Sequence, residues 1–280
     1  MRKLCYLKEK TIAAFVLSIA MTCLIIGNVF AGDNGLTIKG STTVLPIAQA
    51  CAEVYMETNP EINLSVQGGG SGVGIASIID GTADIGDASR AIKDKEIKKA
   101  EEKGVKPVGH VITKDGIAVI VNPSNKISGL TKSQIKSIYT GEISNWSELG
   151  GTSGKIVVIS RDSSSGTFEA FESLALSKAK VRPDALLQAS NQAVATTVAK
   201  TPGAIGYVGL GYVTSKVKPI TVDGIDCNKN TVISGDYPLS RPLFMYTNGN
   251  PKGDLKNFID FVLSFKGQSL AEENGYVGLK

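Results

Sequence analysis

The sequence has very few of the side chains that catalysis and metal binding use most often. It contains one histidine, His110, and four cysteines among its 280 residues. His110 precedes Val111 and Ile112 in a segment with strand character, which favours a structural or surface role over catalysis. No set of His, Cys and acid suits a zinc site or a hydrolytic triad, and no Gly-Lys-Ser/Thr phosphate loop is present. The sequence therefore predicts no catalytic residue, no metal and no cofactor.

The N-terminus has the pattern of a secretory signal. Four basic residues and one acid lie in the first ten positions, and no charged residue follows until Asp33. Val29-Phe30-Ala31 fits a small-residue cleavage site, so we expect residues 1–31 to be a signal peptide cleaved near Ala31. The alternative is an uncleaved anchor over residues 11–30, but polar residues dilute that run. Cys23 follows Ala-Met-Thr, a poor context for lipid attachment, so lipoprotein anchoring is not expected.

Without this segment the chain has little net charge. It keeps 26 basic and 25 acidic residues, and no basic stripe indicates a nucleic-acid partner. Only Cys51 and Cys227 remain, which could form one disulfide but give no disulfide framework and no metal-ligand spacing. Cys51 lies on the apolar stripe of a predicted helix, which favours a buried free thiol.

Strand and helix patterns alternate along the remaining 250 or so residues. We expect strands at 36–40, 62–67, 105–112, 117–121, 155–159 and 244–246. We expect one helix to begin at Pro46 and end before Pro60, and a second to follow the Gly-rich turn at 68–74 and end at Asp80. Further helices are expected at 93–103, 130–139, 168–176, 191–200 and 255–265. This alternation predicts an α/β architecture with mainly parallel sheets, in which ligands bind at the carboxyl ends of strands.

Three strand-to-helix turns rich in Ser, Thr and Gly are the most informative feature. They lie at residues 40–46, 68–74 and 160–167. Such turns present free backbone N–H groups and the positive end of a helix dipole, which together bind anions. Arg161, just before the third turn, can donate two hydrogen bonds to a tetrahedral oxyanion. A Ser-capped helix with a surface arginine would explain one such turn, but three predict a site at which the turns converge.

These turns and other motifs resemble those of the phosphate-binding subunits of bacterial phosphate ABC transporters. The motifs follow in the family's order over nearly the whole mature chain: Gly40–Pro46, Gly69–Gly72, Ala83–Arg90, Tyr139–Gly141 with Asn145-Trp146, Arg161–Thr167 and Pro202–Val208. The resemblance implies an α/β, two-lobed periplasmic-binding-protein fold of type II, whose hinge is two crossover strands near 111–121 and 239–246. Lobe I would be residues 32–113 plus 241–280, and lobe II residues 114–240.

The resemblance also implies which residues bind phosphate. They are hydroxyls, backbone donors, arginines and one acid: Ser41, Thr42, Thr43, Ser71, Gly72, Asp87, Ser89, Arg90, Arg161, Ser165, Gly166 and Thr167. Asp162 or Ser163 would orient Arg161. Better-known members have an aspartate directly after the serine of the third motif, where this chain has Arg90. Asp87, three residues earlier, is the acid that we expect to accept a hydrogen bond from phosphate.

The expected function is that of an extracytoplasmic, periplasmic solute-binding protein. It would capture inorganic phosphate between its lobes as a monomer and deliver it to the membrane permease subunits of an ABC importer. One alternative is a receptor for another tetrahedral oxyanion such as sulfate. An alternative of a different class is a secreted phosphate-ester hydrolase, against which the absence of metal ligands and of a second histidine argues.

Overall fold

The strands of the computed structural model, which describes residues 35–279, form a nine-stranded sheet and a separate two-stranded sheet. The predicted signal peptide at residues 1–31 lies outside the described residues, as do Cys5 and Cys23. The strands are β1 (Gly35–Gly40), β2 (Asn63–Gly68), β3 (Ile85–Ala88), β4 (Pro107–Val121), β5 (Gly129–Leu130), β6 (Val157–Arg161), β7 (Leu186–Gln188), β8 (Ala204–Gly209), β9 (Lys218–Pro219), β10 (Thr221–Val222) and β11 (Ser240–Asn248).

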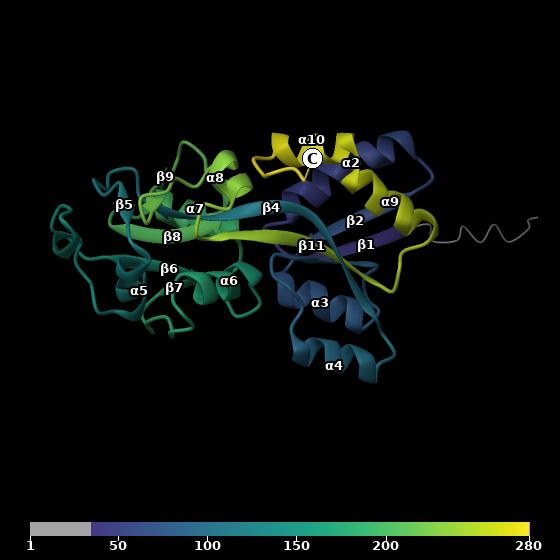
Figure 1. Ribbon diagram of the computed structural model, residues 1–280, viewed down its shortest axis with the longest axis horizontal. Helices are drawn as coiled ribbons and strands as arrows, with labels where there is room; N and C mark the ends of the chain where they lie inside the picture. The colour runs from purple at the N-terminus through teal and green to yellow at the C-terminus, as the bar shows by residue number, and fades with distance from the viewer. Residues whose placement is uncertain (1–34, 280) are drawn as a thin grey trace, which may run out of the picture. The chain divides into compact units, whose positions relative to one another are not determined.

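Helices flank the large sheet on both faces (Figure 1). They are α2 (Leu45–Thr58), α3 (Ser71–Ile79), α4 (Asp94–Glu102), α5 (Lys132–Thr140), α6 (Gly166–Leu174), α7 (Asn191–Lys200), α8 (Lys229–Ser234), α9 (Gly253–Leu263) and α10 (Phe265–Glu273), with 3-10 turns η2 (Trp146–Leu149) and η3 (Leu210–Tyr212). None of the helices in the described residues combines the length and apolar character that crossing a bilayer requires.

The large sheet is parallel at its two flanks and antiparallel at its centre. Its strand order is β2-β1-β3-β11-β4-β8-β6-β7, and β9 also pairs with β4. Strands β1, β2 and β3 run parallel, as do β6, β7 and β8, whereas β4 and β11 run antiparallel to each other and to their outer neighbours. The expectation of mainly parallel sheets is thus right for the flanks and wrong for the centre. The reason is that β11 returns the chain beside β4 in the opposite direction.

The two central strands occupy the places predicted for the crossover strands. β4 is one continuous strand of 15 residues, where the sequence pattern predicted two shorter ones. The pattern was interrupted by Thr113 and Asp115, which are polar but fully buried in the sheet. β11 pairs with β4 from Ser240 to Asn248, with one shift of register after Leu243. The α/β class and the two crossover strands are therefore as predicted.

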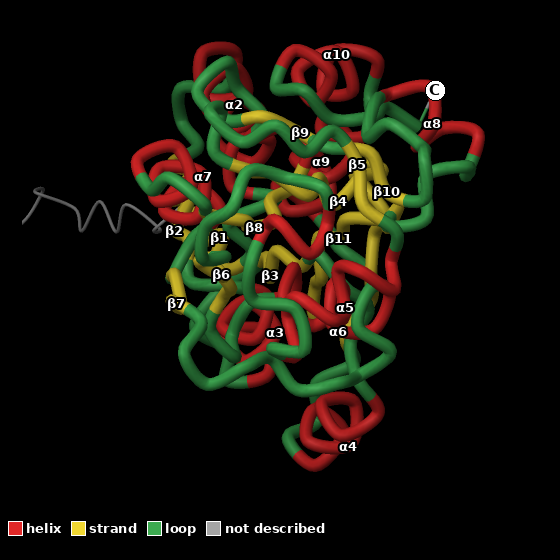
Figure 2. Tube along the Cα trace, turned by 90° about the vertical axis from the view of Figure 1, so that its left-hand side faces the viewer, coloured by secondary structure: helices red, strands yellow, loops and turns green. Residues whose placement is uncertain are grey.

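Two main apolar cores lie toward the two ends of these strands. One joins residues of α2, β1 and β3 to Phe258, Val262 and Leu270 near the C-terminus. The other is built almost entirely from residues 117–239. Helix α3 covers the opposite face of β1 and β3, and α4 packs on the outside of α3 (Figures 1 and 2).

Local sequence signals set the helix ends as expected. Pro46 lies in the first turn of α2, and the helix ends at Thr58, two residues before Pro60. Cys51 is buried on the inner face of α2, and Cys51 and Cys227 are both free thiols, as predicted for Cys51. Helix α7 spans the predicted 191–200. The region 130–139 is different, since Leu130 belongs to β5 and the helix begins at Lys132.

Candidate functional site

The three predicted turns lie at the carboxyl ends of β1, β2 and β6, and each leads into a helix. These helices are α2, α3 and α6. The turns carry hydroxyl side chains that are almost completely buried: Ser41, Thr42, Thr43, Ser71, Ser165 and Thr167. Buried hydroxyl groups need hydrogen-bond partners, so this concentration of them defines a polar site inside the protein.

Direct contacts join the three turns. Ser164 Oγ donates to the Gly69 carbonyl at 2.9 Å, and the Gly72 N–H donates to the Ser164 carbonyl at 2.9 Å. Thr43 Oγ1 and Thr167 Oγ1 are 2.8 Å apart. The turns therefore meet, as the sequence predicted. The N–H of Gly72, a predicted ligand, connects two of the turns.

The turns approach so closely that two positions leave no room for a side chain. Gly70 has φ +96°, and a Cβ there would lie 2.5 Å from Ser164 Oγ. A Cβ on Gly166 would lie 2.2 Å from Ser71 Oγ and 2.9 Å from Ser89 Oγ. Ser89, at the end of β3, donates its N–H to Ser71 Oγ at 2.9 Å. Ser71, Ser89 and Gly166 are thus brought together.

Two serines of the turns accept from backbone N–H groups and keep a free proton, and one of them, Ser165, is the N-cap of α6. Ser41 Oγ accepts the Thr43 N–H at 3.1 Å, and Ser165 Oγ accepts the Phe168 N–H at 3.2 Å. A hydroxyl that accepts from a backbone N–H still has its own proton to donate. Both serines can therefore act as donors to an acceptor placed between the turns.

Arg161 is the last residue of β6, and its side chain is 1% exposed. Its Nε donates to the Gln188 carbonyl at 2.9 Å and its Nη2 to the Ala189 carbonyl at 3.1 Å. Among the described residues, Nη1 has no hydrogen-bond partner although it is buried. Burial lowers the pKa of this guanidinium and the nearby Asp162 carboxylate opposes that shift, so Arg161 stays charged at neutral pH.

Two carbonyl groups therefore orient Arg161, where the resemblance implied Asp162 or Ser163. The closest carboxylate oxygen, Asp162 Oδ2, is 3.9 Å from Nη2. The other oxygen of Asp162 accepts the Ser164 N–H at 2.8 Å and so shapes the turn. The Tyr207 hydroxyl fixes the backbone of Arg161, because it accepts the Arg161 N–H at 3.2 Å.

A second buried arginine, which the sequence reasoning missed, lies between the turns. Arg241 is on β11, directly opposite Asp115 on β4. Its Nε and Nη2 donate to Asp115 Oδ2 at 3.0 and 2.8 Å, and its Nη1 donates to the Ser89 carbonyl at 3.1 Å. Nη2 also donates to Thr167 Oγ1 at 3.0 Å and, more weakly, to Thr43 Oγ1 at 3.4 Å. Arg241 therefore contacts the β1, β3 and β6 ends at once.

Asp115 and Asn191 complete the polar network, and the sequence reasoning missed both. Burial raises the pKa of the Asp115 carboxyl, while Arg241 and backbone N–H groups oppose that shift. Asn191, the first residue of α7, is fully buried and donates its Nδ2 to Thr42 Oγ1 and Thr43 Oγ1 at 3.0 Å each. No pattern in the sequence pointed to them, since Asp115 lies between two expected strands and Asn191 begins an ordinary expected helix.

Arg90, a predicted ligand, is held by carboxylates. Its two terminal nitrogens pair with the two oxygens of Glu96 at 2.8 Å each, and its Nε lies 2.6 Å from Glu169 Oε2. Lys93 Nζ also lies 2.6 Å from that Glu169 oxygen. Arg90, Glu169 and Arg241 line one side of a cavity of about 380 Å³ next to Ser89. Arg90 thus lies at the edge of the hydroxyl cluster with its charge already paired.

Asp87, the predicted acceptor, lies next to the first turn and is 1% exposed. Its backbone carbonyl accepts the Ser41 N–H at 2.9 Å. Among the described residues, its buried Oδ1 has no hydrogen-bond partner. Burial raises the pKa of this carboxyl well above its ordinary value, because the charged form loses its hydration.

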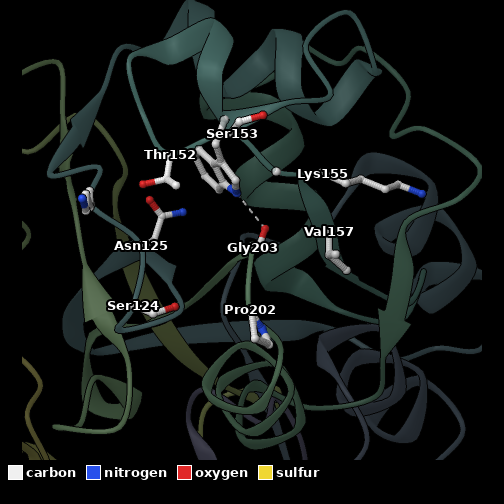
Figure 3. Close-up of a pocket in the computed structure, with 11 residues that line it drawn as sticks. Ser124, Asn125, Thr152, Ser153, Lys155, Val157, Pro202 and Gly203 are labelled. Atoms are coloured by element: carbon white, nitrogen blue, oxygen red, sulfur yellow. Dashed lines mark hydrogen bonds between the residues drawn. The ribbon is translucent and has the colours of Figure 1, made fainter.

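Two of the family-like motifs form a structural cluster away from the turns. Trp146 Nε1 donates to the Gly203 carbonyl at 2.9 Å at the wall of a cavity of about 620 Å³, which shares no lining residue with the three turns (Figure 3). In the same apolar core, Phe171 stacks on Tyr207 and Tyr139 packs edge-on against Phe171. Within residues 35–279, no group of three or more His, Cys, Asp or Glu side chains is arranged to hold a metal.

Comparison with known proteins gives consistent matches over most of the chain. The model of the PBP superfamily domain matches residues 29–266. The phosphate-binding protein PstS of Bacillus subtilis is 36% identical over 247 residues, which cover 88% of this chain and 81% of that protein. PstS of Borreliella burgdorferi is 34% identical, with 88% and 90% covered.

Solved structures give the same result. One from Clostridium perfringens, named as a phosphate ABC transporter substrate-binding protein with bound phosphate, is 34% identical with a TM-score of 0.82, covering 88% of this chain and all of that one. An ABC-type phosphate transport receptor from Vibrio cholerae is 34% identical with a TM-score of 0.71, covering 86% of this chain and 99% of that one.

The buried Asp87 carboxyl makes the stability of the protein depend on pH. Because its pKa is raised in the folded state, its contribution to the free energy of unfolding is full below the ordinary pKa and is lost as pH rises through the folded value. Asp87→Asn should therefore raise the free energy of unfolding at pH 8 by about 1–2 kcal/mol, with a smaller gain at pH 4.5. Urea unfolding at both pH values measures this. Asp226→Asn, at an exposed carboxyl, should show no such gain; a destabilised Asp87→Asn at pH 8 would contradict the prediction.

Proposed function

The chain belongs to the PBP superfamily and, within it, to the PstS phosphate-binding proteins, and on this premise we propose that it captures inorganic phosphate and delivers it to an ABC importer. The observation that carries the proposal is the meeting of three strand-to-helix turns beside Arg161. Their hydroxyls offer protons to one place, and a buried guanidinium nitrogen faces no acceptor of the described chain. Such a set of donors suits a small oxyanion.

The ligand set that we propose is the predicted one. It comprises hydroxyl, backbone and charged groups: Ser41, Thr42, Thr43, Ser71, Gly72, Asp87, Ser89, Arg90, Arg161, Ser165, Gly166 and Thr167. Arg241 lies behind this set, where its guanidinium donates to the Ser89 carbonyl and to Thr167 Oγ1. Phosphate is multiply charged at neutral pH, and its burial requires that this charge be compensated by such donors.

The chain acts as a binding protein and is not an enzyme, as its membership of this family indicates. A hydrolase would need a nucleophile paired with a base, or a metal-activated water. The lone histidine supports this reading, because His110 Nε2 pairs with Thr247 Oγ1 at 3.0 Å in the central strands. A sulfate receptor remains the competing function of the same class.

We propose that residues 32–113 plus 241–280 and residues 114–240 are two lobes that close on the anion. Several contacts cross this division: Thr43 with Thr167, Gly72 with Ser164, and Arg90 with Glu169. The apolar cores follow nearly the same division. Closure of the lobes would therefore assemble the donors and shield them from water.

Delivery requires the membrane permease subunits of an ABC importer as partners, and we propose that the protein serves them as a periplasmic monomer. Residues 1–31 would be the signal peptide that directs export, with cleavage near Ala31. Closure would then present both lobes to the permease only when phosphate is bound, which couples occupancy to delivery.

Calorimetry with a panel of oxyanions tests the function. We expect phosphate to bind with a Kd near or below the micromolar range, corresponding to about −8 kcal/mol, and sulfate to bind at least 100-fold more weakly. A chromogenic phosphate ester should not be turned over. Equal affinity for sulfate would support the competing receptor, and turnover without phosphate binding would refute the proposal.

Asp87→Asn should reduce the difference in affinity between phosphate and sulfate if Asp87 accepts a hydrogen bond from the phosphate proton.

Arg161 should be essential for tight binding. Arg161→Ala should cost about 2–5 kcal/mol of phosphate binding, because it removes a buried charge that faces the anion. Arg161→Lys should also bind poorly, since an ammonium cannot reproduce two parallel hydrogen bonds. Calorimetry measures both, and Arg182→Ala, at an arginine paired with Asp184 near the surface, should bind as the wild type does. A folded Arg161→Ala protein with unchanged affinity would remove Arg161 from the site.

The ion pair between Arg90 and Glu169 should stabilise the closed form. Glu169→Gln should raise the phosphate dissociation rate two- to fivefold, a loss of about 0.5–1 kcal/mol, because Arg90 and Lys93 lose their partner across the lobes. Its Kd should also depend less on salt concentration than that of the wild type. Stopped-flow displacement of phosphate gives the rate. Glu172→Gln, on the same helix, is the matched control; identical rates for Glu169→Gln and the wild type would mean that the pair does not hold the lobes.

A further inference from the structure

The hydroxyl groups of the site are oriented by two residues that lie behind them. We propose that Arg241 and Asn191 are positioning residues, which occupy the lone pairs of Thr42, Thr43 and Thr167 so that the hydroxyl protons of Thr42 and Thr167 are directed to the bound anion. This inference rests on the proposed function and adds to it the mechanism by which the site becomes a set of donors.

The guanidinium of Arg241 is fixed in position and can only donate. Asp115 Oδ2 accepts from its Nε and Nη2, and the Ser89 carbonyl accepts from its Nη1. These contacts on two edges set the plane of the group, so that Nη2 also reaches Thr167 Oγ1 at 3.0 Å and Thr43 Oγ1 at 3.4 Å. Nη2 has two protons, and since Asp115 accepts one of them, the two threonine oxygens share the other. Because a guanidinium has no acceptor, both oxygens accept in these contacts.

The amide of Asn191 is oriented just as firmly. Its Oδ1 accepts the Gly209 N–H at 3.1 Å, which identifies the oxygen and leaves Nδ2 on the opposite side. Nδ2 donates to Thr42 Oγ1 and Thr43 Oγ1 at 3.0 Å each, and the Asn191 N–H lies 3.4 Å from Thr42 Oγ1. Thr42 and Thr43 therefore both accept from Asn191.

Because these donors occupy lone pairs of the hydroxyl oxygens, they determine where each hydroxyl proton can point. Thr43 Oγ1 accepts from Asn191 at 3.0 Å and, more weakly, from Arg241 at 3.4 Å, so in the proposed arrangement Thr43 is the donor of its 2.8 Å contact with Thr167 Oγ1. Thr167 then accepts from Thr43 and Arg241, and its own proton is free; the nearest hydroxyl, Ser89 Oγ, is 3.5 Å away and too far for a strong bond. Thr42 accepts only from Asn191, so its proton is also free.

The result is a directional chain from a charged group to the anion. A hydroxyl that accepts from a guanidinium becomes a stronger donor, because successive hydrogen bonds polarise one another. Asp115 balances the positive charge of Arg241. Arg241 acts on the ligand only by donating to Thr167, whose hydroxyl it polarises. Arg161, whose Nη1 has no acceptor in the described chain, contacts the anion directly.

A double-mutant cycle for phosphate binding separates this role from a direct or a purely structural one. Thr167→Val should weaken binding of inorganic phosphate about 10- to 100-fold, and Thr167→Ser, which keeps the hydroxyl, should restore it. Arg241→Lys keeps a positive charge opposite Asp115 but cannot donate to both threonines, and should weaken binding about 10-fold. In the Thr167→Val background, Arg241→Lys should weaken phosphate binding less than twofold, because the Thr167 hydroxyl through which Arg241 acts on the anion is already missing.

A second cycle keeps the test decisive if Arg241→Lys does not fold. Asn191→Leu has a similar volume without donors, and should lose about 10-fold in affinity alone but less than twofold on top of Thr42→Val. Urea unfolding of each variant reports structural damage separately. The inference would be overturned if, in a cycle whose variants are folded, the two losses of phosphate affinity simply multiplied in the double mutant. It would also be overturned if Thr167→Ser bound phosphate no better than Thr167→Val. Wild-type protein that fails to bind phosphate would refute the proposed function itself, so the two failures are distinguishable.

Discussion

The ion pair between Asp115 and Arg241 is the interaction on which the rest of the structure depends. It joins the two central strands at positions that face each other in the sheet, and both side chains are almost completely buried. Removing one partner would leave an unpaired charge inside the protein, a far larger loss than the net value of the pair. Because the pair is neutral overall, it can lie at the centre of the site without adding net charge, and Arg161 supplies a buried guanidinium whose Nη1 has no acceptor in the described chain. The same pair fixes the hydrogen bonds that Arg241 makes to Ser89 and Thr167.

The density of donors around this pair is possible only because the turns almost touch. Gly70 and Gly166 stand where a methyl group would collide with a serine of another turn. Ser165 caps α6 by accepting the Phe168 N–H, and Ser41 accepts the Thr43 N–H within the first turn. Two of the converging hydroxyls therefore also hold the backbone of their own turns in place. Specific backbone shapes therefore bring the hydroxyl donors together beside Arg161.

Local features of the chain were predictable, and long-range ones were not. The turns, the limits of α2 and α7 and the position of Arg161 all follow from short stretches of sequence, and their meeting followed from the repetition of one pattern. Arg241, Asp115 and Asn191 could not be found in this way, since each is a single polar residue in an otherwise ordinary segment. Their role depends on the pairing of strands more than a hundred residues apart. The continuous strand β4 was missed for the same reason: Asp115 interrupts its apolar pattern, and only its partner on β11 explains it.

The support of the first turn has a consequence for the order of folding. Tyr276 is fully buried and donates its hydroxyl to the Thr43 carbonyl at 2.7 Å across a separation of 233 residues, and α9 and α10 complete the core under α2. Contacts between segments so far apart in sequence form late, because a long loop of chain has to close before they can be made. During folding the first turn therefore gains this support only after α9 and α10 have docked against α2, and the anion site in this half of the molecule is completed late.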